Sequence, residues 1–222
     1  MRFAAFALGI LLTGCFPVMA HPTRVEPGLR LTPIASIALI VDSSGAGGPV
    51  THAVVPSLDF EASLAVRDSF RVDGPGLRLS AVAGMSGYGG AAYAELPRDQ
   101  FGDFDVGVGL AAHRGALKLW TPYVQFGRHE AEDMSWFLRN GIAFAAPLDS
   151  ARWSVLWIPT VGVARHRSNR IATLFLSAVI GRQQDVDRPC FFDCQSAFVR
   201  TQVMLGSSLS FTLMTPYRPD RR

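Results

Sequence analysis

Apolar and polar residues alternate along most of this chain beyond residue 28. In the clearest stretch, 197–214, odd positions carry apolar residues such as Val199 and Leu205, and even positions carry Arg200 and Gln202. Successive side chains of a β-strand point to opposite faces, so this pattern predicts a strand with one apolar and one polar face.

Further segments repeat this alternation, and turn signals rich in Gly, Pro, Asn and Asp separate them. The run from Gly87 to Gly90 predicts a flexible loop, and the segment that follows it, 91–96, is short. With that segment the chain has about ten strands; single-chain bacterial barrels have an even number, so ten is expected and eight is possible. In chain order the expected strands are 29–41, 54–67, 77–85, 91–96, 103–112, 117–127, 134–146, 153–165, 171–182 and 197–214.

An all-β fold, a closed antiparallel up-and-down β-barrel, suits these strands. Closure removes the unpaired edges that so apolar a sheet would otherwise expose, and most segments are long enough to cross a hydrocarbon core with tilt. Aromatic girdles at the two interfaces are typical of outer-membrane barrels, which this chain resembles as a general class. The apolar faces carry Trp120, Trp136, Trp153 and Trp157.

The polar faces are expected to line the lumen. A narrow lumen can be filled by its own paired side chains, which predicts a filled scaffold; a narrow water-filled pore is the alternative. The expected lumenal charges are Arg30, Asp59, Glu61, Arg78, Glu95, Asp103, Asp105, Arg139, Arg152 and Arg200.

The first residues are typical of an export signal, with Met1-Arg2 followed by an apolar run over 3–12. Leu12-Thr13-Gly14-Cys15 resembles the lipobox of bacterial lipoproteins, and that resemblance implies cleavage before Cys15 and its lipidation. Cleavage after Ala20 is the alternative, since small residues favour signal peptidase. The expected organisation is a signal over 1–20, a barrel over 21–216 and a tail over 217–222.

The three cysteines are an odd number for an exported chain. Cys190 and Cys194 are close in sequence, and an exported loop is oxidising, so a local disulfide is expected between them. Cys15 is then the remaining cysteine, which agrees with lipidation or with loss of the signal. Two thiolates are half of a zinc site, and no metal or other cofactor is expected.

Composition narrows the classes of partner. Charged residues make up 18% of the chain, and the net charge is +3, a low charge content for a soluble domain. No basic cluster with interleaved aromatic residues appears, so nucleic acid is not an expected partner. Membrane lipid and the outer-membrane assembly machinery are the expected partners, and the sequence identifies no small ligand.

His166-Arg167-Ser168-Asn169 resembles the His-x-Ser-Asn motif of outer-membrane lipid A deacylases. That family's His and Ser act with a downstream glutamate, and here no glutamate follows Ser168. A serine nucleophile needs a base, and the base needs an orienting acid. Ser-Asn is also common in hairpin turns, so a plain turn is the favoured interpretation.

The leading functional hypothesis is a non-enzymatic outer-membrane barrel with a structural, adhesive or narrow-channel role. The alternative is a lipid-anchored periplasmic barrel of lipocalin type, whose apolar faces would point inward around a small ligand. A third hypothesis is an esterase similar to the lipid A deacylases. The predicted location is the outer membrane, with the periplasmic face as the alternative.

Overall fold

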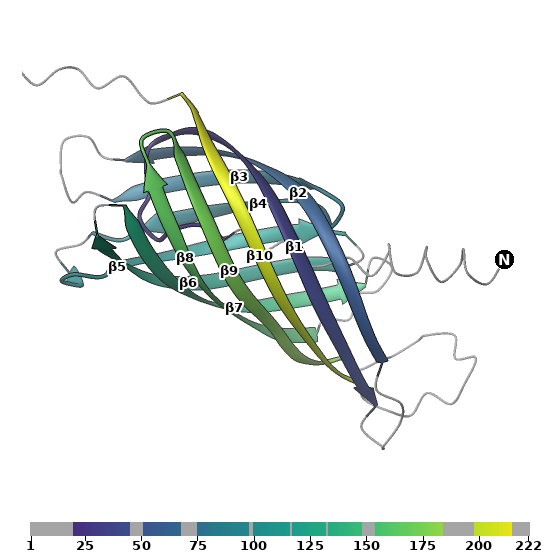
Figure 1. Cartoon of the computed structure of the whole chain (residues 1–222). Coiled ribbons are helices and arrows are strands. Elements are labelled where there is room, and N and C mark those ends of the chain that lie inside the picture. Colours follow the sequence, from purple (N-terminus) through teal and green to yellow (C-terminus); the bar gives the residue numbers. More distant parts are fainter. Residues whose placement is uncertain are drawn as a thin grey trace, which may run out of the picture.

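The computed structural model describes residues 20–44, 51–67, 75–97, 100–115, 117–131, 133–147, 154–183 and 198–214. Each strand pairs antiparallel with its chain neighbours, and β1 pairs with β10 to close the ring (Figure 1). The predicted fold class is therefore confirmed. The ten strands are β1 (Gly28–Ser44), β2 (Thr51–Arg67), β3 (Gly76–Gly84), β4 (Gly87–Glu95), β5 (Asp105–Arg114), β6 (Leu117–Ala131), β7 (Met134–Pro147), β8 (Ser154–Arg167), β9 (Arg170–Gln183) and β10 (Phe198–Met214).

The expected loop from Gly87 to Gly90 is wrong, because these residues form the first half of β4. Glycine has low β-propensity, so the run appears loop-like in the sequence. Tight pairing explains its presence in a strand: a Cβ on Gly89 would lie 2.3 Å from the backbone oxygen of Ala112 on β5. The actual turn between β3 and β4 is Met85-Ser86.

The two ends of the barrel differ. At one end β1 begins and β10 ends, and β6 and β8 turn there into β7 and β9; we call it the terminal end. Strands β1, β2 and β10 have 17 residues each, whereas β3 and β4 have 9. The long strands therefore extend beyond the rest of the wall at the opposite end (Figure 1).

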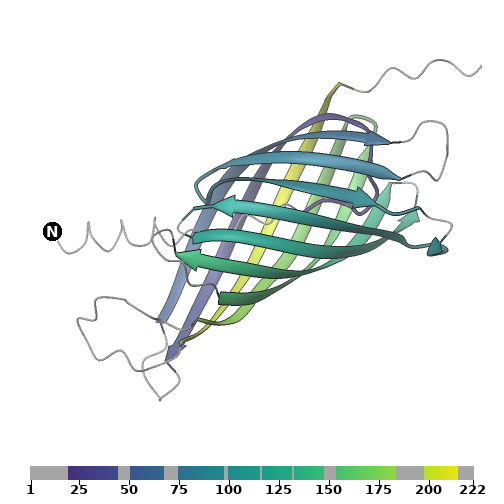
Figure 2. The ribbon, with the colours of Figure 1, turned by 180° about the vertical axis from the view of Figure 1, so that it is seen from behind.

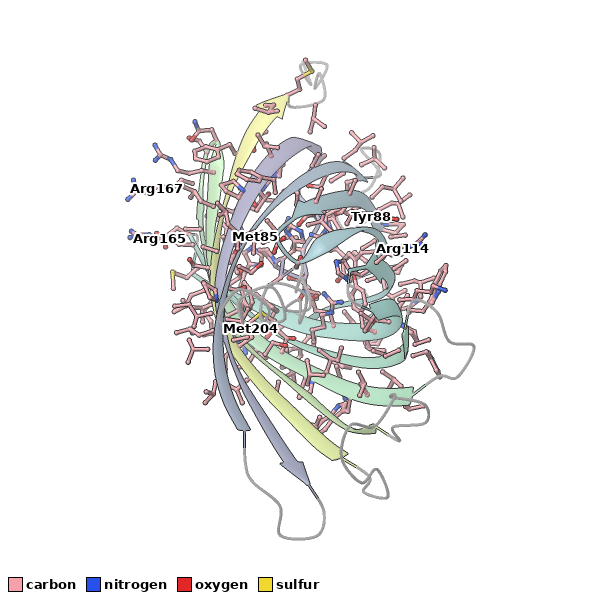
Figure 3. All side chains as sticks on the ribbon, turned by 90° about the vertical axis from the view of Figure 1, so that its right-hand side faces the viewer. Met85, Tyr88, Arg114, Arg165, Arg167 and Met204 are labelled. Carbon is pink, nitrogen blue, oxygen red and sulfur yellow. The ribbon has the colours of Figure 1, made fainter. Side chains whose placement is uncertain are left out.

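The outer face of the wall is apolar. Alternate residues such as Leu58, Phe60 and Leu64 on β2 are exposed, whereas the residues between them are buried. Trp120 and Trp157 are exposed on this face by 50% and 48%. Side chains radiate outward all around the ring in Figure 3. The alternation in the sequence thus assigned the faces of the wall correctly.

The inner face combines aromatic rings with glycines on neighbouring strands. A Cβ on Gly109 would lie 2.3 Å from the Tyr123 ring, and a Cβ on Gly206 would lie 2.3 Å from the Phe175 ring. Glycine at these positions leaves room for an inward-pointing ring to lie flat against the wall. Gly107 and Gly162 accommodate Tyr93 and Phe137 in the same way.

Several sequence predictions lie outside the described residues. These are the signal segment over 1–19 with Cys15, the Cys190–Cys194 pair, Trp153 and the tail over 217–222. Within the described residues, no helix has the length and apolar character needed to cross a membrane.

Candidate functional site

A short segment before β1, residues 20–27, lies inside the barrel (Figures 1 and 2). We call it the lumenal segment. Ala20, His21 and Val25 are 3%, 8% and 0% exposed. The chain turns from this segment into β1 at Gly28, whose φ of 140° and close approach to the backbone oxygen of Met214 require glycine. The sequence pattern of residues 20–27 did not predict this position.

The start of the segment is bound to the inner faces of β2 and β6. His21 Nε2 donates to both carboxylate oxygens of Glu61 at 2.7 Å, and Gln125 Nε2 donates to the backbone oxygen of His21 at 2.7 Å. Burial lowers the pKa of His21, although Glu61 opposes this shift. Ala20 packs into an apolar cluster with Phe137 and Met204.

The middle of the segment has both its backbone and its side chains bound by the wall. Tyr93 donates its hydroxyl proton to the backbone oxygen of Thr23 at 2.9 Å. The backbone N–H of Val25 donates to Glu95 Oε2 at 2.8 Å, and Arg67 bridges to Glu95 Oε1 at 2.6 Å. These contacts satisfy polar groups that would be costly to bury alone.

Two glycines of the wall make room for the segment. A Cβ on Gly76 would lie 2.6 Å from Val25 Cβ, and a Cβ on Gly127 would lie 2.3 Å from Thr23 Oγ1. Both distances are shorter than ordinary van der Waals contact. The wall is therefore shaped to the lumenal segment.

The segment ends at the terminal end in a chain of hydrogen bonds. Ser135 Oγ lies 2.7 Å from His166 Nε2, and His166 Nδ1 lies 2.5 Å from Glu26 Oε1. The other carboxylate oxygen of Glu26 accepts from Arg30 Nη2 at 2.5 Å. Burial alone would raise the pKa of Glu26, but the hydrogen bond from His166 and the charge of Arg30 outweigh burial and hold the pKa at about 2.

A second histidine lies beside this chain of contacts. The rings of His129 and His166 have centroids 4.9 Å apart, and Asp105 Oδ2 lies 3.3 Å from His129 Nδ1. Glu26 and His129 keep 32% and 21% of their side chains exposed, whereas Ser135 and His166 are buried. The cluster therefore reaches from the lumen to solvent at this end.

Two arginines lie over tyrosine rings deeper in the lumen. Arg139 lies 3.6 Å from the centroid of Tyr123, and Arg78 lies 4.9 Å from that of Tyr93. The two tyrosine rings stack with centroids 6.1 Å apart. Cation–π contacts of this kind stabilise a buried guanidinium.

Most of the expected lumenal charges that can be placed are buried within the barrel. Asp103 is the exception: it lies in the turn before β5 with 81% of its side chain exposed. Arg152 and the side chain of Arg200 lie outside the described residues. The buried members are Arg30, Asp59, Glu61, Arg78, Glu95, Asp105 and Arg139.

The His166–Ser168 motif does not form a site as the resemblance implied. Ser168 and Asn169 form the exposed turn between β8 and β9, whereas His166 is buried and contacts Ser135 and Glu26. Among the described residues, no three His, Cys, Asp or Glu side chains gather in a way that would hold a metal ion.

The contacts between the lumenal segment and the wall could not be read from the sequence. Ser135 and Glu26 are distant in sequence from His166 and belong to no spacing motif with it. A usable signal was present in Gly76 and Gly127, which occupy inward-facing positions where a side chain would have been expected. Small residues at such positions indicate the close approach of another part of the chain.

Comparisons with known proteins identify no family and no function for this chain. No protein-family model matches the chain, and no curated protein matches it in sequence. Among solved structures it is similar to a KdgM porin, with a TM-score of 0.40 and 12% identity, over 81% of this chain and 99% of that one. Neisserial surface protein A (NspA) matches with a TM-score of 0.35 and 10% identity, over 82% of this chain and 97% of that one. Ail, the attachment invasion locus protein of Yersinia pestis, matches with a TM-score of 0.33 and 12% identity, over 84% of this chain and 100% of that one. At this level of similarity, nothing about function follows.

Proposed function

We propose that this chain is an outer-membrane β-barrel whose lumen is a narrow channel closed by the lumenal segment. A closed ring of strands leaves no backbone edge unpaired, as a hydrocarbon environment requires. Among the described side chains, each of the ten strands exposes apolar residues on the outer face, whereas most charges and hydrogen-bonding groups lie inside. This division between the two faces suits a wall with lipid outside and polar groups inside.

The orientation of the faces argues against the lipocalin-type alternative. That alternative places the apolar faces inside, around a ligand, with polar faces toward solvent. Here Leu58 and Leu176 are 45% and 47% exposed, whereas Glu61 and Asp105 are 0% and 1% exposed. An exposed apolar surface this extensive needs an apolar partner, and lipid is the partner we propose.

The position of the lumenal segment carries the proposal of a closed channel. The segment lies within the ring and is bound to β2, β4, β6 and β8 through Glu61, Glu95, Gln125 and His166. A neutral hydrogen bond contributes about 0.5–1.5 kcal/mol, and one to a charged group about 1.5–3 kcal/mol. These contacts are hydrogen bonds and ion pairs, which can break and re-form, so the proposed closure can open.

Conductance in planar lipid bilayers tests this proposal. The comparison is between the wild type and a variant lacking residues 21–26, both isolated from membranes and both checked for faster gel migration before boiling. We expect low conductance from the wild type and larger, stable openings from the variant, because the variant lacks the groups that fill the lumen.

Asp133→Asn is the matched control, because Asp133 contacts Arg165 at the exposed surface and does not touch the segment. It should conduct as the wild type does. Equal conductance of the wild type and the deletion variant would contradict the closed channel. If neither protein conducted, the lumen would be filled by the side chains of the wall, and a filled scaffold would be the better description.

A further inference from the structure

The geometry around His166 has the arrangement of a nucleophile, a base and an orienting acid. Ser135 Oγ to His166 Nε2 is 2.7 Å, and His166 Nδ1 to Glu26 Oε1 is 2.5 Å. The first distance lies within the roughly 2.6–3.2 Å expected between a serine nucleophile and its base, and the second is a short contact between the base and a carboxylate that can orient it. The three residues come from β7, β8 and the lumenal segment, so only the folded barrel assembles them.

We propose that Ser135, His166 and Glu26 form a hydrolytic site for small water-soluble carboxylic esters at the terminal end of the barrel. This activity goes beyond the channel proposed above and does not depend on it. It also differs from the motif seen in the sequence, because Ser135 replaces Ser168 as the nucleophile and Glu26, upstream in the chain, supplies the acid.

The ionisation of Glu26 fixes the roles of the two histidine nitrogens. Arg30 donates to Glu26 Oε2 at 2.5 Å and keeps the carboxylate charged. An ionised carboxylate can only accept hydrogen bonds, so His166 Nδ1 carries the proton that it donates to Glu26. His166 Nε2 then has a free lone pair, which accepts the hydroxyl proton of Ser135.

The reaction follows from this proton arrangement. Ser135 Oγ adds to the ester carbonyl carbon while its proton passes to His166 Nε2. The tetrahedral adduct collapses, the bond between the carbonyl carbon and the alkoxy oxygen breaks, and the leaving alcohol takes the proton from His166. Water then attacks the acyl-serine and gives a proton to His166; this proton returns to Ser135 Oγ as the carboxylic acid leaves.

The direction of the side chains sets the class of substrate. Arg165 and Arg167 point outward in Figure 3, and His166 between them is buried. Ser135 is likewise buried between the outward-facing Met134 and Trp136. An ester embedded in lipid would meet the outer face and not this site. The substrate must therefore arrive through water at the terminal end, where Glu26 keeps 32% of its side chain exposed.

Covalent labelling of the full-length protein in detergent tests the site. A fluorophosphonate probe reacts with an activated serine, and the tryptic peptide over 129–139 contains Ser135 as its sole serine, whereas Ser168 falls in the peptide over 168–170. The rate of p-nitrophenyl acetate hydrolysis measures the esterase activity of the same protein. We expect labelling of the 129–139 peptide and ester hydrolysis in the wild type.

Variants separate the triad from a hydrogen-bonded network that only holds the segment in place. Ser135→Ala should abolish labelling, and His166→Asn should lower labelling and hydrolysis by at least about 100-fold, the usual contribution of a general base. Ser168→Ala is the matched control and should label as the wild type does. Faster gel migration before boiling shows that each variant is folded.

Glu26 is a positioning residue, and its test needs a separate readout. Glu26→Gln should lower kcat and change the pH profile of hydrolysis, because the His166 tautomer is no longer fixed, and Glu26→Asp should restore part of the rate. Absence of label on Ser135 in the folded wild type, or labelling unaffected by His166→Asn, would overturn the proposal.

Discussion

At the scale of single residues, glycines in the barrel wall leave space for the lumenal segment. Gly76 is the sharpest case, because the three nearest atoms to a Cβ built there all belong to Val25 and to the carboxylate of Glu95 that binds Val25. No wall backbone atom is among them. A side chain at position 76 would therefore displace the segment rather than disturb the hydrogen bonds between β2 and β3.

Gly76→Ala should loosen the segment while leaving the barrel folded. Overpacking of this kind costs about 1–3 kcal/mol, which shifts the ratio of closed to open lumen by roughly 5-fold to 150-fold. Conductance and amide hydrogen exchange over 20–27 should both rise. Gly141→Ala is the control, since its Cβ would meet Thr121 and Tyr123 of the wall and not the segment. An unchanged exchange rate over 20–27 in Gly76→Ala would count against the fit described here.

At the scale of elements, strand β4 shows how pairing overrides local propensity. The run from Gly87 to Gly90 has few of the side chains that favour strands. It nevertheless pairs along its whole length with β3 and, from Tyr88 onward, with β5. The closeness of these backbones makes glycine a requirement of the wall.

Gly89→Ala should therefore damage the wall itself. Its Cβ would lie 2.3 Å from the backbone oxygen of Ala112 and 3.0 Å from the Cα of His113, so β4 and β5 would have to separate locally. We expect a smaller fraction of folded barrel after refolding into detergent, measured by migration before boiling. Deletion of residues 21–26 should leave that fraction unchanged, and the same folded yield for Gly89→Ala and the wild type would show that β4 tolerates the change.

The elements also differ in how far the sequence predicted them. Alternation predicted ten strands, with the first half of β4 missed, and it assigned Leu58 outward and Glu61 inward, because the period of two follows directly from strand geometry. It could not find the lumenal segment, because residues 20–27 have no period and gain their contacts only inside a closed ring. The alternation also could not predict that Ser135 and Glu26 lie beside His166, because only the closed barrel brings these residues together.

At the scale of the whole molecule, the proposed membrane environment predicts a depth-dependent cost for charge on the outer face. Leu58 lies near the middle of β2 and points outward, whereas Met214 ends β10. Leu58→Arg should lower the free energy of unfolding in lipid vesicles by about 2–4 kcal/mol, and Met214→Arg by about 0–1 kcal/mol. Urea titration of both variants measures the difference. Equal costs at the two depths would argue against a lipid-facing wall.

The enclosure of residues 20–27 also bears on the two cleavage sites expected from the sequence. Ala20 lies in the interior, packed with Phe137 and Met204. If the chain is cut after Ala20, a short free end can swing into the finished ring. If it is cut before Cys15, the added residues span at most roughly 18 Å, and their acyl chains need lipid rather than a polar interior. If the lipobox prediction holds, a lipid-anchored N-terminus would therefore compete with the filled lumen for the same few residues.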